Sequence, residues 1–245
     1  MESAALLEPL SVAIHATRRA SIEQGDTAVV FGAGTVGLLT AAMAKLSGAT
    51  TVVIADIDSG RVNYALANGF AHKGYIVHPR RHLSETAEKL AVAKELAEDV
   101  MQIASLNDPD FEGADVTFDC TGKEICMQAG LYVSHSSIFL SFLLLTCSKA
   151  TRPGGKLIMV GMGTPIQTLP MSASHLKEVD IIGIFRYANT YPIGIKIISS
   201  GALPSLDNMV THRFRGLTAA KDAFELAGKT VDKEGRLVLK ILVEN

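Results

Sequence analysis

The chain has 245 residues, of which 48% are apolar, and a formal net charge of −2. This is enough for one large domain, or one domain and part of another, and the near-neutral charge without basic runs argues against a nucleic-acid partner. No apolar run reaches the roughly 18 residues of a membrane-spanning helix, no signal peptide is evident, and the cysteines form no CxxC pair, so we expect a cytoplasmic protein that does not bind membranes.

Apolar spacing predicts alternating helices and strands over residues 1–184. The predicted helices are 8–19, 34–47, 59–68, 84–104 and 124–132, and the predicted strands are 27–31, 51–55, 75–77, 115–119, 156–160 and 180–184. The strands are near-continuous apolar runs, which is typical of a parallel sheet covered by helices on both faces. Beyond residue 184 the pattern changes to helices 188–200 and 219–228, an extended segment 210–216 and a strand 236–242. We therefore predict a boundary near residue 184.

The motif GAGTVG follows the first predicted strand and opens the next helix. In this context Gly32 allows a tight turn, Gly34 lets the backbone approach a pyrophosphate, and Gly37 lets the helix lie close to the strand. The amino terminus of the helix offers free N–H groups to phosphates. The motif predicts an α/β Rossmann fold, a doubly wound parallel sheet that binds a dinucleotide.

Asp56 stands at the end of the second predicted strand, where its carboxylate can accept both ribose hydroxyls of adenosine. A carboxylate there would repel a 2′-phosphate, so NAD is favoured over NADP. Arg61 could stack on adenine or steady the ribose, but it could also tolerate NADP. A methyl-donor-binding enzyme and a non-catalytic nucleotide-binding module remain alternatives.

Seven segments together span nearly the whole chain: LLEPLSVAIHATRR (6–19), FGAGTVG (31–37), VVIADIDSGR (52–61), FDCTG (118–122), GGKLIMVGMG (154–163), EVDIIGIFRYANTYP (178–192) and VTHRF (210–214). They resemble the C-terminal part of the zinc-dependent medium-chain polyol dehydrogenases. The resemblance implies oxidation of a secondary alcohol of a polyol by NAD, with zinc polarising the alcohol oxygen. It favours xylitol and D-xylulose over sorbitol or L-arabinitol as substrates, and it implies a homo-oligomer.

The resemblance also implies roles for single residues. The pyrophosphate turn would consist of Gly32, Gly34, Val36 and Gly37, and the ribose contacts would be Asp56 and Arg61. Val160, Gly161 and Met162 would lie beside the nicotinamide, and Ile184, Phe185 and Arg186 would close over it. Arg186 and Tyr187 would contact polyol hydroxyls, and Glu8 would lie near the zinc, as a ligand directly or through a water.

Each of these roles has a structural alternative. Glu8 precedes a proline, where an acid often only starts a helix, and Arg186 and Tyr187 could be surface residues. We interpret Cys120 as a small buried residue rather than a metal ligand or nucleophile. The histidines show no metal-ligand spacing such as HExxH, so we interpret them as surface or structural residues.

Two features depart from the family pattern. The family places its main zinc ligands and proton relay in a preceding catalytic domain, so we expect this chain to lack them and to be inactive alone. Residues 185–245 would then be a remnant of that GroES-like catalytic domain, and strand 236–242 would expose an edge and an apolar face. The second departure is the apolar segment VSHSSIFLSFLLLTCSK (133–149). We interpret this segment as a retained intron, with an extended helix or a partner-binding hairpin as the alternative.

Overall fold

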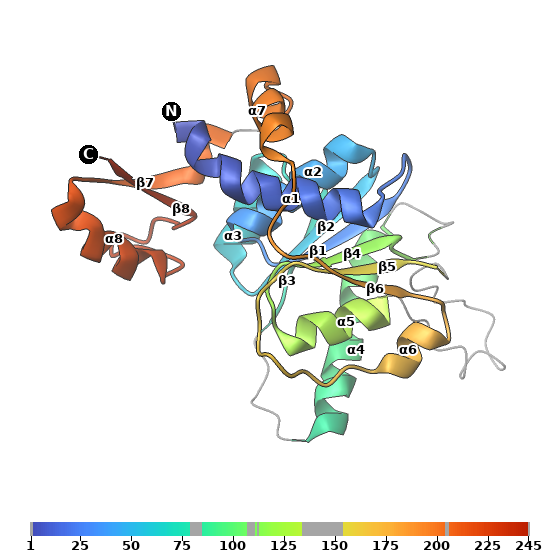
Figure 1. Ribbon diagram of the computed structural model, residues 1–245. Coiled ribbons are helices and arrows are strands. Elements are labelled where there is room, and N and C mark those ends of the chain that lie inside the picture. The colour runs from blue at the N-terminus through green and yellow to red at the C-terminus, as the bar shows by residue number, and fades with distance from the viewer. Residues whose placement is uncertain are drawn as a thin grey trace.

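The computed structural model describes residues 2–78, 85–106, 111, 113–133, 154–203 and 206–244. Its centre is a parallel sheet of six strands in the order β3-β2-β1-β4-β5-β6 (Figure 1). The strands are β1 Thr27–Phe31, β2 Thr51–Asp56, β3 Lys73–Ile76, β4 Val116–Asp119, β5 Lys156–Met159 and β6 Asp180–Gly183. The strand order reverses between β1 and β4, which is the place where open α/β sheets bind ligands.

Helices cover both faces of this sheet, as the apolar strands predict. The helices α1 (Leu7–Ala20), α2 (Thr35–Ser47) and α3 (Ser59–Ala67) contribute to one buried cluster, and α4 (Thr86–Ala104) and α5 (Glu124–Val133) contribute to the other. Successive residues of β1 point to opposite faces, so Ala28 and Val30 join the first cluster and Val29 and Phe31 the second. Each such buried side chain larger than alanine stabilises the fold by about 1.5–3 kcal/mol. The predicted doubly wound α/β fold is confirmed.

The C-terminal residues divide their contacts between this core and a second sheet. Helix α7 (Tyr191–Ser200) packs on α1, and Ile193 and Ile197 contact the first cluster. The strands β7 (Val210–Arg215) and β8 (Lys240–Glu244) pair in parallel beside α8 (Ala220–Ala227), apart from the main sheet (Figure 1). The proposed boundary near residue 184, and the origin of 185–245 in a catalytic domain, stay predictions.

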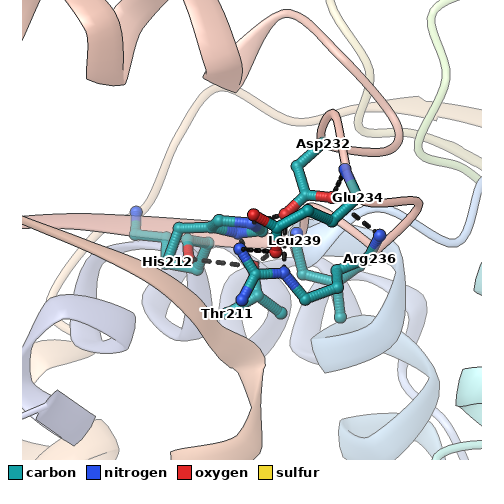
Figure 2. A network of polar contacts seen from close by, with 7 residues as sticks. Thr211, His212, Asp232, Glu234, Arg236 and Leu239 are labelled. Carbon is teal, nitrogen blue, oxygen red and sulfur yellow. Dashed lines mark hydrogen bonds and ion pairs between the residues drawn. The ribbon is translucent and has the colours of Figure 1, made fainter.

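The predicted strand 236–242 is wrong in its first half, because a tight turn occupies the preceding residues. Figure 2 shows the carboxylate of Asp232 at the centre of this turn. It accepts hydrogen bonds from the backbone N–H groups of Glu234 (2.9 Å) and Arg236 (2.8 Å), and from Arg236 Nε (2.7 Å). His212 Nε2 lies 3.1 Å from the same carboxylate. Strand β8 consequently begins only at Lys240, and Val243 is its exposed apolar residue.

Other differences from the predicted elements are small. The helix predicted for 188–200 begins at Tyr191, because Arg186 and Asn189 have φ angles of +50° and +56° that no helix accommodates. A short helix, α6 (Met171–His175), was not predicted. It packs Ala173 against Leu131 and Leu157 in a third, smaller cluster.

The segment 133–149 lies outside the described residues, apart from Val133 at the end of α5. Its interpretation as a retained intron therefore stays a prediction. Within the residues that the structure does describe, no helix is both long enough and apolar enough to cross a bilayer.

Candidate functional site

The turn between β1 and α2 uses its three glycines in different ways. Gly32 has a φ of +98°, which favours glycine, and its N–H donates to the carbonyl of Ala55 (2.7 Å). A Cβ on Gly37 would lie 1.8 Å from the carbonyl oxygen of Gly32, so α2 approaches the turn as closely as its backbone allows. A Cβ on Gly34 would meet nothing within 4 Å. The space beside Gly34 is therefore open to a ligand.

The amino terminus of α2 faces this open space without a side-chain cap. Gly34 is the N-cap residue, and no side chain of the described residues accepts a hydrogen bond there. Val36 lies in the first helical turn and is partly exposed. Thr35 directs its hydroxyl elsewhere, to the carbonyl of Leu239 (2.9 Å), which places the C-terminal residues beside the turn. The uncapped N–H groups and the helix dipole together form an anion-binding position.

Asp56 joins the end of β2 to the glycine turn. Its Oδ2 accepts a hydrogen bond from the N–H of Ala33 (2.6 Å), and its Oδ1 accepts one from the N–H of Asp58 (2.9 Å). A carboxylate has about four lone-pair positions, so it can still accept two hydroxyl groups. Arg61, in the first turn of α3, donates its N–H to Asp58 (3.0 Å), and its buried Nε has no hydrogen-bond partner.

The loops after β4 and β5 continue this edge of the sheet. The N–H groups of Val160 and Gly161 donate to the carbonyl of Asp119 at 2.9 and 2.8 Å. A Cβ on Gly161 would lie 2.1 Å from the nitrogen of Gly122, so the two loops touch backbone to backbone. Met162 follows with 88% of its surface exposed.

Asp119 is fully buried, and its carboxylate fixes the loop after β4. Its carboxylate accepts hydrogen bonds from the N–H groups of Thr121 and Gly122, both at 3.0 Å, and from the Thr121 hydroxyl. Burial raises the pKa of Asp119, although these hydrogen bonds act in the opposite direction. Asp119 was not among the predicted site residues, because it does not have the spacing from the glycine motif that pointed to Asp56.

The segment after β6 presents the remaining predicted residues. Ile184 packs partly against the core, whereas Phe185 is 76% exposed and lies below the guanidinium of Arg186, 5.6 Å from ring centroid to Cζ. The hydroxyls of Tyr187 and Tyr191 are 3.3 Å apart. Tyr191 was not among the predicted residues, although it lies in the segment FRYANTYP that carries the resemblance.

Glu8 is exposed on the first turn of α1, the helix on which α7 packs. The pKa of Tyr191 is raised, chiefly by its hydrogen bond with Tyr187, and the negative charge of Glu8 also contributes. The structure thus brings Glu8 to the segment after β6, while the glycine turn, Asp56 and the loops after β4 and β5 share the carboxyl edge of the sheet.

The described residues do not form a metal centre. No three of their His, Cys, Asp or Glu side chains are grouped so that they could hold an ion. Cys120 is half-buried and packs against the first cluster. Burial raises the pKa of its thiol to about 12, and its Sγ lies 3.8 Å from the hydroxyl of Thr40, which supports a packing role rather than that of a nucleophile. His72 accepts a hydrogen bond from the N–H of Val52 (2.9 Å), and His212 pairs with Asp232, so both have structural partners.

Comparison with known proteins places these features in a family. A family model described as "Zinc-binding dehydrogenase" matches residues 35–137. The sorbitol dehydrogenase of Mus musculus is 36% identical over 231 residues, which cover 94% of this chain and 54% of that protein. The sorbitol dehydrogenase of Homo sapiens is 35% identical over 234 residues, covering 91% of this chain and 52% of that protein.

The fold has close counterparts among solved structures. A zinc-binding dehydrogenase from Sinorhizobium meliloti 1021, solved with bound NADP, superposes with a TM-score of 0.70 at 20% identity and covers 98% of this chain. At that identity the likeness shows the fold alone. The chain spans about half the length of the curated relatives it matches. By these matches, the chain belongs to the zinc-dependent medium-chain polyol dehydrogenase family and corresponds to the C-terminal part of its relatives.

Proposed function

We propose that the chain binds NAD(H) at the carboxyl edge of its sheet and serves as the nucleotide-binding part of a polyol dehydrogenase. The diphosphate would lie at the uncapped amino terminus of α2, beside Gly34. The adenosine ribose would lie against Asp56, and the nicotinamide would lie near Val160, Gly161 and Met162. The segment from Ile184 to Arg186 would close over it.

The observation that carries this proposal is the hydrogen bond between Ala33 N–H and Asp56 Oδ2 (2.6 Å). It joins the ribose-binding acid to the phosphate-binding turn, so both ends of an adenosine diphosphate would meet groups held in one fixed arrangement. Preorganisation of this kind increases affinity because little ordering is left for the ligand to induce. The remaining lone pairs of the carboxylate suit ribose hydroxyls and repel a 2′-phosphate, which supports NAD over NADP.

Calorimetric titration with NADH and NADPH tests the proposal. We expect NADH to bind more tightly than NADPH, and Asp56→Ala to weaken NADH binding at least about tenfold, the equivalent of about 1.4 kcal/mol. Asp180→Ala is the matched control, because Asp180 is exposed at the amino end of β6, at the opposite edge of the sheet. No heat with NADH, or an unchanged affinity after Asp56→Ala, would overturn the proposal.

For the full reaction we propose hydride transfer from a secondary alcohol of a polyol to NAD, with xylitol and D-xylulose as the substrate pair. In this family zinc would polarise the alcohol oxygen. The described residues supply Glu8 as a single candidate ligand, so they do not fit a complete zinc site. This chain would bind the nucleotide, and Arg186 and Tyr187 would contact polyol hydroxyls. Glu8 would lie near the zinc, as a ligand directly or through a water.

We further propose that the chain alone does not oxidise polyols, because its described residues bring no three metal ligands together. An assay of NAD reduction with xylitol and added zinc salt tests this. Zinc-dependent turnover above background would contradict it. Self-association and a cytoplasmic location stay predictions.

A further inference from the structure

The junction of α1 and α7 gathers oxygen atoms that the nucleotide site does not use. Thr190 is buried and donates its hydroxyl to the carbonyl of Ser11 (3.3 Å), which ties the segment after β6 to α1. A Cβ on Gly194 would lie 2.7 Å from Leu7 Cδ1, so the first turns of the two helices are in direct contact. Glu8 and Tyr191 therefore project from the ends of two helices that pack together.

The backbone between these helices is held in an uncommon conformation. Arg186 and Asn189 both have left-handed φ angles although neither is glycine. Such residues cost roughly 1–3 kcal/mol each and occur often where a functional side chain must be directed. Here the turn between them carries Tyr187 back toward Tyr191, and the two rings lie 5.2 Å apart at 55°.

The direction of the hydrogen bond between the two phenols determines what Tyr187 can offer a ligand. Tyr191 donates its hydroxyl to Tyr187 across 3.3 Å, so the proton of Tyr187 is free to be donated onward. A hydroxyl that accepts one hydrogen bond becomes a better donor in the next, and its rotation is restricted. The exposed carboxylate of Glu8, on the helix that packs on α7, only accepts. A polyol hydroxyl accepts one hydrogen bond and donates another, so it can accept from Tyr187 and donate to an acid on the neighbouring helix.

We propose that Tyr191 is a positioning residue for a polyol hydroxyl, acting through its hydrogen bond to Tyr187 at the cluster of Glu8, Tyr187 and Tyr191. The proposal rests on the proposed function for its ligand class, an alcohol with neighbouring hydroxyls. It adds a residue that does not itself touch the ligand. The hydroxyl of Tyr191 sets the orientation of the Tyr187 hydroxyl, which would contact the ligand.

Saturation-transfer NMR titration of the full chain with xylitol, with and without NADH, tests the proposal. We expect Tyr191→Phe to weaken xylitol binding roughly two- to tenfold, the loss of one neutral hydrogen bond. Tyr187→Phe should weaken it at least as much, and the double variant should bind no more weakly than Tyr187→Phe alone. Tyr64→Phe is the matched control, because it removes a phenol hydroxyl outside the cluster that has no hydrogen-bond partner.

The outcomes separate this proposal from the nucleotide proposal. Three outcomes would each overturn the role of Tyr191. These are unchanged xylitol affinity in Tyr191→Phe, independent and additive losses of affinity in the double variant, and no xylitol binding by the wild-type chain. Equal thermal midpoints of the variants would show that the loss is not one of folding. Because the titration is also run without NADH, a failure of nucleotide binding leaves the result with xylitol readable.

Discussion

Substituting Gly37 by alanine should destabilise the fold by about 3 kcal/mol or more. The new Cβ would lie 1.8 Å from the carbonyl oxygen of Gly32 and 2.8 Å from its carbonyl carbon, whereas ordinary contact begins near 3.4 Å. Neither atom is the free end of a side chain, and the N–H of Gly32 is bonded to the carbonyl of Ala55 at 2.7 Å. Helix α2 would therefore have to move away from the turn, and NADH affinity should fall with it.

Gly34→Ala separates the effect on stability from the effect on NADH affinity. Gly34 has a φ of −76° and open space where a Cβ would lie, so alanine fits the backbone and should change stability by less than about 1 kcal/mol. Its methyl group would occupy the approach of the diphosphate, so NADH affinity should fall at least about tenfold. Because the chain has no tryptophan, urea unfolding is best followed by far-ultraviolet circular dichroism, with calorimetry for NADH.

Two results would refute this reasoning. An unfolding free energy of Gly37→Ala within 1 kcal/mol of the wild type would mean that the turn and α2 are not in contact as described. Full NADH affinity in Gly34→Ala would mean that the ligand does not approach the turn beside this residue.

Two pH-dependent predictions concern the buried Lys177 and the half-buried Asp232. Burial lowers the pKa of Lys177 to about 8. Between about pH 8 and pH 10 the unfolded chain therefore binds more protons than the folded chain, and the stability of the fold should rise with pH. Lys177→Met should remove that rise and raise the thermal midpoint at pH 7. Although burial acts in the opposite direction, hydrogen bonds from His212, Arg236 and Glu234 hold the pKa of Asp232 below its usual range. The stability that Asp232 contributes should be present above about pH 4 and should be lost as the pH falls toward the pKa of Asp232 in the folded chain. Asp232→Asn should lower the thermal midpoint at pH 7 and remove this loss of stability in acid. Thermal unfolding at several pH values measures both, and variants that unfold like the wild type at every pH would contradict them.

The central sheet was predictable because local signals and burial agree there. The runs that became β1 and β2 are apolar and short, and Gly32 and Gly37 mark a turn that leaves little choice of geometry. The C-terminal strand was predicted too early, because the apolar pattern around Leu237 competes with the Asp232 turn. A side chain that closes a turn on a residue four positions ahead leaves no trace in hydrophobic periodicity.

The sequence pointed to most residues of the candidate site but not to their contacts, and their roles stay predictions. The motif and the family resemblance gave Asp56, but not its bond to Ala33, which depends on the register of two neighbouring strands. Tyr191 was not predicted because its contact with Tyr187 depends on a left-handed turn between them. Helical or strand spacing cannot reveal such a pair.

The hydrogen bond from Thr35 to Leu239 spans 204 positions of the chain. During synthesis on the ribosome, the sheet strands β1 to β6 emerge long before Leu239 does. The glycine turn thus acquires this contact only after all six strands of the sheet have been made, and contacts between such distant residues form slowly because a long loop must close first. Nascent chains arrested before Leu239 leaves the exit tunnel should therefore hold the nucleotide less firmly than released chains.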